Sequence, residues 1–168
     1  MGTFPAELPQ EIPRIPASAG ALLFDCEGRL LIVNPTYKKH WTIPGGQIEE
    51  GGETPWEACR RETHEECGIQ IEQGRLVCVD VRPAKGTDKP GGLRFLFHCG
   101  TLRDEQIAQI TLQAREISEY RFAELDHAAE LLSGPVRRRV LAGARTRACV
   151  YLEDGRPVPQ ILTPGLNA

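Results

Sequence analysis

The sequence predicts a single layered α/β domain in which helices cover a β-sheet. Its 168 residues give the length of one domain that can bury a core, and 40% of them are hydrophobic. Short runs rich in β-branched and aromatic residues are interspersed with segments that carry helix start and stop signals. Several strands with only a few helices are typical of a sheet against which helices pack.

The two ends of the chain are predicted to lie outside this domain. Residues 1–16 contain four prolines, which block regular helix and favour an extended N-terminal arm. The domain itself is predicted over residues 17–160. Residues 161–168 are predicted to form a loose tail.

The first two strands are predicted at residues 19–24 and 29–34, joined as a hairpin. The four residues between them read Asp-Cys-Glu-Gly, and Gly28 suits a positive φ in the turn. Later β-type runs predict strands at residues 41–43, 75–82, 93–99 and 119–122, and a closing hairpin of 150–152 with 156–158. The polar stretch between the strands at 93–99 and 119–122 carries no clear signal.

Three helices are predicted, and the first has the strongest signals. Thr54 as N-cap, Pro55 at the first helical position and Glu57 at the third form a capping box, and Gly68 ends the helix. A second helix is predicted at 123–132. The third is announced by Ser133 and Pro135 and runs to about residue 147, with the arginines at 137–139 on its solvent surface.

Composition and charge exclude several classes of function. A net charge of −3 and a pI near 5.8 disfavour the broad basic surface that polynucleotide binding needs. No signal peptide or membrane-spanning run is recognisable, so we expect a soluble, cytoplasmic protein. Six scattered cysteines without metal-ligand spacing are expected to be free thiols. Sixteen arginines against four lysines indicate a GC-rich bacterial source.

Residues 44–69 carry the chemistry, since they hold seven glutamates in one loop and one helix. At 100° per residue, Glu62, Glu65 and Glu66 share one sector of about 100°, opposite a largely apolar side. Like charges this close destabilise an isolated helix, whereas Mg²⁺ prefers several oxygen ligands and bridges carboxylates to phosphates. An acidic, solvated helix surface is the alternative interpretation.

The neighbouring residues favour the metal site over a solvated surface. Gly45 and Gly46 precede the loop and allow its backbone to approach a metal or phosphate closely. Arg61 comes directly before Glu62 and offers a planar set of donors that can orient the carboxylates.

This segment resembles the signature of the Nudix (MutT-like) hydrolases, G-x5-E-x7-R-E-U-x-E-E-x-G-U, in which U is aliphatic. Glu53, seven residues, and then the run from Arg61 to Ile69 reproduce its second half in every charged position. Two departures stand out: six residues instead of five separate Gly46 from Glu53, and Thr63 replaces an aliphatic residue. We expect Gly51 and Gly52 to absorb the extra residue.

The resemblance implies a fold, a reaction and roles for individual residues. It implies the Nudix fold, a mixed β-sheet sandwiched between helices (α/β/α), and Mg²⁺-dependent cleavage of a diphosphate linkage, with Mn²⁺ as a possible substitute. The implied metal ligands are the Gly46 carbonyl and the glutamates at 62, 65 and 66. Arg61 is implied to orient them, with Glu53 and Gly68 supporting the motif. The general base is expected to be Glu65, with Glu116 as the alternative.

The substrate is less well defined by the sequence. Anion binding is expected from Lys38 or Lys39, Arg82 or Arg94, and Tyr37 could stack a base or line a pocket. We expect a small nucleoside diphosphate derivative: a nucleoside triphosphate, an oxidised nucleotide or a nucleotide sugar. The alternatives are a non-nucleotide diphosphate, a Nudix-fold module that binds a nucleotide without cutting it, and an acidic interaction domain. The family resemblance makes a homodimer plausible.

Overall fold

The computed structural model describes residues 14–86 and 91–161 of the chain. The predictions for residues 1–13 and 162–168 therefore lie outside the described residues. None of the described helices is both long and apolar enough to span a membrane. The elements, in chain order, are β1 (Ala17–Phe24), β2 (Leu30–Pro35), β3 (Gly45–Gln47), α1 (Pro55–Cys67), β4 (Arg75–Arg82), β5 (Gly92–Thr101), α2 (Asp104–Ala108), β6 (Ile117–Ala123), α3 (Leu125–Leu131), α4 (Gly134–Ala144), β7 (Val150–Glu153) and β8 (Arg156–Pro157).

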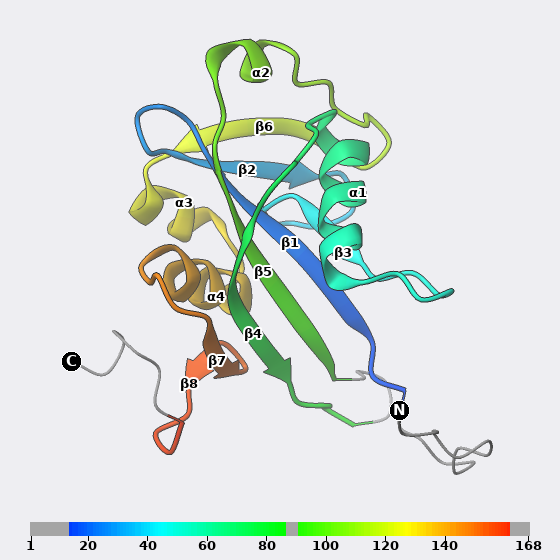
Figure 1. The fold of residues 1–168 in the computed structure, drawn as a ribbon, viewed down its shortest axis with the longest axis vertical. Coiled ribbons are helices and arrows are strands. Elements are labelled where there is room, and N and C mark those ends of the chain that lie inside the picture. Colours follow the sequence, from blue (N-terminus) through cyan, green and yellow to red (C-terminus); the bar gives the residue numbers. More distant parts are fainter. Residues whose placement is uncertain (1–13, 87–90, 162–168) are drawn as a thin grey trace, which may run out of the picture.

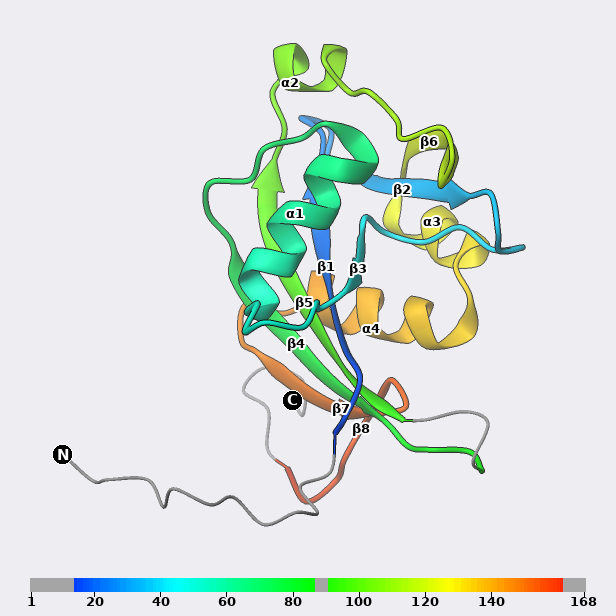
Figure 2. The ribbon, with the colours of Figure 1, turned by 90° about the vertical axis from the view of Figure 1, so that its right-hand side faces the viewer.

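These elements form one mixed sheet with helices on both faces, as the resemblance implied. The strand order is β6-β2-β1-β5-β4-β7-β8, with β3 paired to β1 off this path. The β1–β5 and β4–β7 pairs are parallel and the other pairs are antiparallel. Helix α1 covers one face of the sheet, while α3 and α4 cover the other (Figures 1 and 2). The predicted α/β/α architecture is confirmed.

Each face of the sheet has its own hydrophobic core. Leu22 and Leu96 point to the α4 side and pack with Val140, whereas Leu23 and Leu31 point to the α1 side and pack with helix residues there. Neighbouring positions of a strand alternate between faces, so one strand serves both cores. Burial on both sides fixes the register of the central strands, because a shift by one residue would exchange the two faces.

Strand β3 corrects the predicted strand at 41–43. Residues 41 and 42 make only isolated bridges, and the regular strand is formed by Gly45–Gln47, the glycine pair expected to precede the loop and the first residue of that loop. The cause is that β2 pairs with β1 only at Phe24 and Leu30 and then diverges, so the other half of β1 has a free edge. β3 fills that edge, opposite Ser18, Ala19 and Gly20.

Most of the remaining predictions are confirmed within a few residues. Both hairpins form, with φ of 79° at Gly28 in the first turn and 74° at Gly155 in the last. Helix α4, the third of the predicted helices, ends at Ala144 and is shorter than predicted. Helix α2 was not predicted: its five residues, none of them fully buried, are too few to show the repeated apolar spacing that makes helices recognisable. All six cysteines are free.

Candidate active site

Helix α1 begins and ends where its sequence predicts. The Thr54 hydroxyl accepts the Glu57 N–H at 3.2 Å, and the Glu57 carboxylate accepts the Thr54 N–H at 2.8 Å, which completes the capping box. Gly68 ends the helix with φ of 71°. Thr63 is fully buried and its hydroxyl donates to the Cys59 carbonyl at 2.7 Å, so the residue that departs from the family pattern leaves no unsatisfied polar group in the core.

Glu66 is the most deeply buried carboxylate of this helix, with only 3% of the residue exposed. Its Oε2 accepts a hydrogen bond from the Gly45 N–H at 2.8 Å, which ties α1 to β3. Burial, reinforced by the nearby carboxylates of Glu62 and Glu116, raises the pKa of Glu66 from its ordinary value of 4.5 to about 7. Burial thus disfavours the ionised carboxylate, and a positive charge placed beside Glu66 would stabilise that ionised form.

Glu62 lies next to Glu66 and packs against the backbone of β3. A Cβ atom on Gly46 would overlap the Glu62 carboxylate, so only glycine allows this approach. Burial also raises the pKa of Glu62, against the opposing effect of its bond to Arg61. Two partly desolvated carboxylates thus face the strand that carries Gly45 and Gly46.

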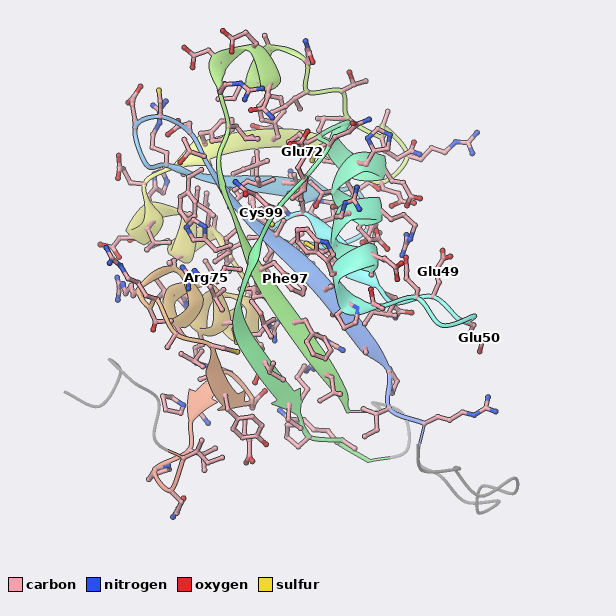
Figure 3. All side chains as sticks on the ribbon, viewed as in Figure 1. Glu49, Glu50, Glu72, Arg75, Phe97 and Cys99 are labelled. Carbon is pink, nitrogen blue, oxygen red and sulfur yellow. The ribbon has the colours of Figure 1, made fainter. Side chains whose placement is uncertain are left out.

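Arg61 joins the helix to the loop that precedes it. Its Nε donates to Glu53 Oε1 at 2.7 Å and its Nη2 to Glu53 Oε2 at 3.1 Å, a bidentate pair, while Nη1 donates to Glu62 Oε1 at 3.0 Å. Gly51 and Gly52 adopt φ of 96° and 94°, so the longer loop turns at the predicted place, and Glu53 reaches Arg61. This loop projects from the sheet and carries Glu49 and Glu50 at its exposed end (Figure 3).

The third helix glutamate, Glu65, is placed differently from the other two. Its side chain is 53% exposed and pairs with Arg61 Nη1 at 3.1 Å, on the outer side of the helix. Of the three helix glutamates, Glu62 and Glu66 line the cleft and Glu65 does not. Glu116, from the loop before β6, lines the cleft with them, held there by a bond from Thr36 N to its carbonyl.

These groups line a cleft of about 740 Å³, a size suited to a small-molecule ligand. Tyr37, Arg82 and Arg94, the residues expected to contact the substrate, line this cleft. Lys38 also lines it, whereas Lys39 is exposed and is not among the lining residues. Apolar surface comes from Trp41, Ile43, Leu96 and Val136.

One lining residue corrects a sequence-based prediction. Arg139 belongs to the run expected on the solvent surface of the third helix, yet it is only 8% exposed and lines the cleft. The signal that could have identified it is helical periodicity: Arg139 adjoins the core residue Val140 and lies three positions after the cleft residue Val136. Its buried partner, Asp80, is 59 positions away in sequence, which no local pattern indicates.

The oxygen ligands offered here fit a hard divalent cation whose coordination shell is completed by water and by substrate phosphates. Within residues 14–86 and 91–161, no three acidic, histidine or cysteine side chains are arranged to hold a metal on their own. Mg²⁺, however, is usually held by one or two carboxylates together with water and substrate phosphates. Glu62 and Glu66 supply two carboxylates, and the adjacent Gly46 backbone offers a carbonyl.

An α/β/α sandwich that holds one buried and one half-buried glutamate against a diglycine strand defines a Nudix-fold protein. The NUDIX domain model matches residues 14–143, so the chain belongs to the Nudix family. No curated protein matches it.

Solved structures agree with this assignment. The MutT protein from Methanosarcina mazei Go1 is 21% identical with a TM-score of 0.63, over 76% of this chain and 91% of that one. The MutT protein from Bacillus halodurans is 20% identical with a TM-score of 0.65, over 82% and 87% of the two chains. A C. elegans Ap4A hydrolase is 21% identical with a TM-score of 0.62, over 76% and 94%. At this level of identity the similarity concerns the fold.

Proposed function

We propose that this protein is a Mg²⁺-dependent hydrolase that cleaves a diphosphate linkage in a nucleoside diphosphate derivative. The observation that carries the proposal is Glu66, a buried carboxylate with a raised pKa that faces Glu62 and the diglycine backbone. A protein that merely needed a stable helix would place an apolar residue there, because an uncompensated buried carboxylate costs stability. A cation-dependent function explains why the charge is retained.

Glu62, Glu66 and the Gly46 carbonyl are the groups that would hold the cation. When bound, Mg²⁺, or Mn²⁺ in its place, neutralises phosphate oxygens and lowers the pKa of a water molecule. Arg61 fixes the carboxylates in position through its bonds to Glu53 and Glu62. The bidentate pair makes Arg61 a positioning residue with little freedom to rotate.

We propose Glu116 as the general base that accepts a proton from the attacking water. It lines the cleft with Glu62 and Glu66, and a base must lie within hydrogen-bond reach of the proton it removes. Glu65, the base expected from the sequence, is turned toward Arg61 and solvent. In this proposal Glu65 keeps Arg61 in place and does not contact the substrate.

The substrate is proposed to be a small nucleotide derivative. The cleft has the volume for one, and Tyr37 and Lys38 at its mouth offer an aromatic ring and a positive charge. Structural relatives include an Ap4A hydrolase, a UDP-X diphosphatase and a dihydroneopterin triphosphate pyrophosphohydrolase, whose names all describe phosphate-anhydride substrates. The relatives support the chemical class and leave the individual substrate open.

The test is a screen of nucleoside triphosphates, nucleotide sugars and dinucleoside polyphosphates with Mg²⁺, measuring phosphate, pyrophosphate and nucleoside monophosphate as products. We expect turnover that requires the cation and is lost in Glu66→Gln and Glu116→Gln but retained in Glu65→Gln. Tight nucleotide binding without turnover would instead favour a sensing module. Loss of turnover in Glu65→Gln with retention in Glu116→Gln would reverse the assignment of the base.

A further inference from the structure

Three arginines from three different elements line the cleft on the α4 face of the sheet. Arg94 on β5 lies opposite Asp80 on β4, and Arg82 follows Asp80 by two positions. The side chains of Arg94, Asp80 and Arg82 therefore point to the same face of the sheet. Arg139 reaches this point from α4 and donates from Nη1 to Asp80 Oδ2 at 2.8 Å. Ser18, the β1 neighbour of Arg94, lines the cleft beside them.

Asp80 is engaged by Arg139 and by the backbone and makes no hydrogen bond to Arg94. Its Oδ2 accepts from Arg139, and its Oδ1 accepts the Gly155 N–H at 2.8 Å. Arg94 donates instead to the carbonyls of Leu93 at 2.8 Å and Pro16 at 3.5 Å. Within the part of the chain that the structure describes, the buried Nε of Arg139 has no hydrogen-bond partner, so the guanidinium retains an unused donor.

The charges of this cluster do not balance. Among the residues that the structure describes, the three guanidiniums lie with the single carboxylate of Asp80, which gives a net charge of +2 (three minus one) in a partly desolvated place. Burial, and then repulsion by Arg139 and Arg82, lowers the pKa of Arg94. Like charges gathered in this way are unfavourable unless an anion joins them.

The arginine cluster is separate from the glutamate cluster, although both line one cleft. The charged groups that act on the pKa of Glu66 are Glu62, Glu116 and Lys38, whereas those that act on Arg94 are Arg139, Arg82 and Asp80. The two sets share no member. Along β5 and α4, the arginines are neighboured on the same face by the apolar lining residues Leu96 and Val136.

We propose that Arg82, Arg94 and Arg139 form a subsite for a terminal phosphate group of the substrate, apart from the diphosphate linkage near Glu62 and Glu66. A phosphate monoester carries a charge of about −1.5 to −2 at neutral pH, which matches the net charge of the subsite better than a carboxylate does. Its oxygens also suit the planar donors of arginine. The inference rests on the proposed function, because it assigns the same substrate a phosphate at a second position.

The first experiment measures binding of inorganic phosphate to the metal-free protein by calorimetry, with acetate as the carboxylate probe. We expect phosphate to bind more tightly than acetate. Arg94→Gln should weaken phosphate binding about tenfold or more, as the loss of a charge-assisted contact does. Arg94 is the residue to change, because replacing Arg139 would leave Asp80 buried without its partner and could unfold the protein.

The matched control is Arg145→Gln, which removes an exposed arginine just after α4 that pairs with Asp126 on the surface. It should bind phosphate like the wild type. Absence of phosphate binding, equal binding of acetate, or an equal loss in Arg94→Gln and Arg145→Gln would each overturn the subsite.

The second experiment compares substrates that differ only in one phosphate monoester remote from the diphosphate. Arg94→Gln should raise the KM about tenfold or more for the substrate that carries the phosphate monoester. The KM for the substrate without it should stay nearly unchanged. Turnover with no such difference overturns the subsite and leaves the proposed hydrolase intact. Arg94-dependent phosphate binding without any turnover does the reverse.

Discussion

Replacing Glu66 by glutamine should make the metal-free protein more stable at alkaline pH. The carboxylate is almost completely buried, and its pKa in the folded protein is about 7 against an ordinary value of 4.5. The folded state therefore holds the proton more tightly than the unfolded state does. The contribution of protonated Glu66 to the free energy of unfolding is fully present below about pH 4.5 and is lost as the pH rises through about 7.

The size of the effect follows from these two values. Because a tenfold change in an ionisation constant is worth about 1.4 kcal/mol, the ionised Glu66 costs about 3 kcal/mol above pH 7. The amide of Glu66→Gln keeps the size of the side chain and an oxygen for the Gly45 N–H, but it carries no charge. For a domain of this length, about 3 kcal/mol corresponds to a rise in melting temperature of about 6–12 °C.

The assay is thermal melting of wild type and Glu66→Gln from pH 5 to pH 8, first in a chelator and then with Mg²⁺. In the chelator, the difference should be largest at pH 8 and should shrink below about 1 kcal/mol near pH 5. A cation present at 100 times its Kd should raise wild-type stability by about 2.7 kcal/mol. Glu66→Gln should lose most of that gain.

The matched control is Glu65→Gln, which neutralises an exposed carboxylate on the same helix. It should gain little stability in the chelator, since exposed charges contribute within about 1 kcal/mol. If Glu66→Gln were no more stable than wild type at pH 8, the account of its burial would be wrong. An equal Mg²⁺ response in wild type and Glu66→Gln would refute its role as a ligand.

Three further substitutions test other parts of the site. Gly46→Ala should abolish turnover and the Mg²⁺ response in melting, because its Cβ would displace the Glu62 carboxylate; a fully active variant would contradict the packing. Arg61→Lys should lower kcat about tenfold or more, since lysine cannot form the bidentate pair, and an unchanged kcat would exclude a positioning role. Thr54→Ala should cost about 1 kcal/mol in denaturant unfolding through loss of the N-cap, and no loss would contradict the cap geometry.

The parts of the fold that local chemistry determines could be predicted from the sequence. Helix α1 is the best example: its start at Thr54 and its end at Gly68 depend on residues within one turn of each terminus. The partnership of Arg61 with the glutamates also follows from spacing along one helix. Strand β4 was predicted with its observed bounds because the residues between its terminal arginines are mostly apolar and β-branched, with Asp80 as the one charged residue among them.

The parts that were missed depend on distant residues. Gly45 and Gly46 have low strand propensity and form β3 only because β2 leaves an edge of β1 free. Arg139 is drawn inward by Asp80, a partner on another element. Which of the three helix glutamates bind a metal stays a prediction, since Glu62 and Glu66 line the cleft while Glu65 pairs with Arg61.

The contact of Asp80 with Gly155 links the cleft to a segment beyond residue 143, where the match to the family model ends. The same turn accepts bonds from Arg138 Nε and Nη2 at its Asp154 carbonyl, so β7 and β8 support the arginine end of the cleft. The glutamate end, by contrast, is built from residues within the matched range, with Glu62 and Glu66 on α1 and Glu116 before β6. Changes in the last strands would therefore alter the proposed phosphate subsite while leaving the proposed hydrolytic centre unchanged.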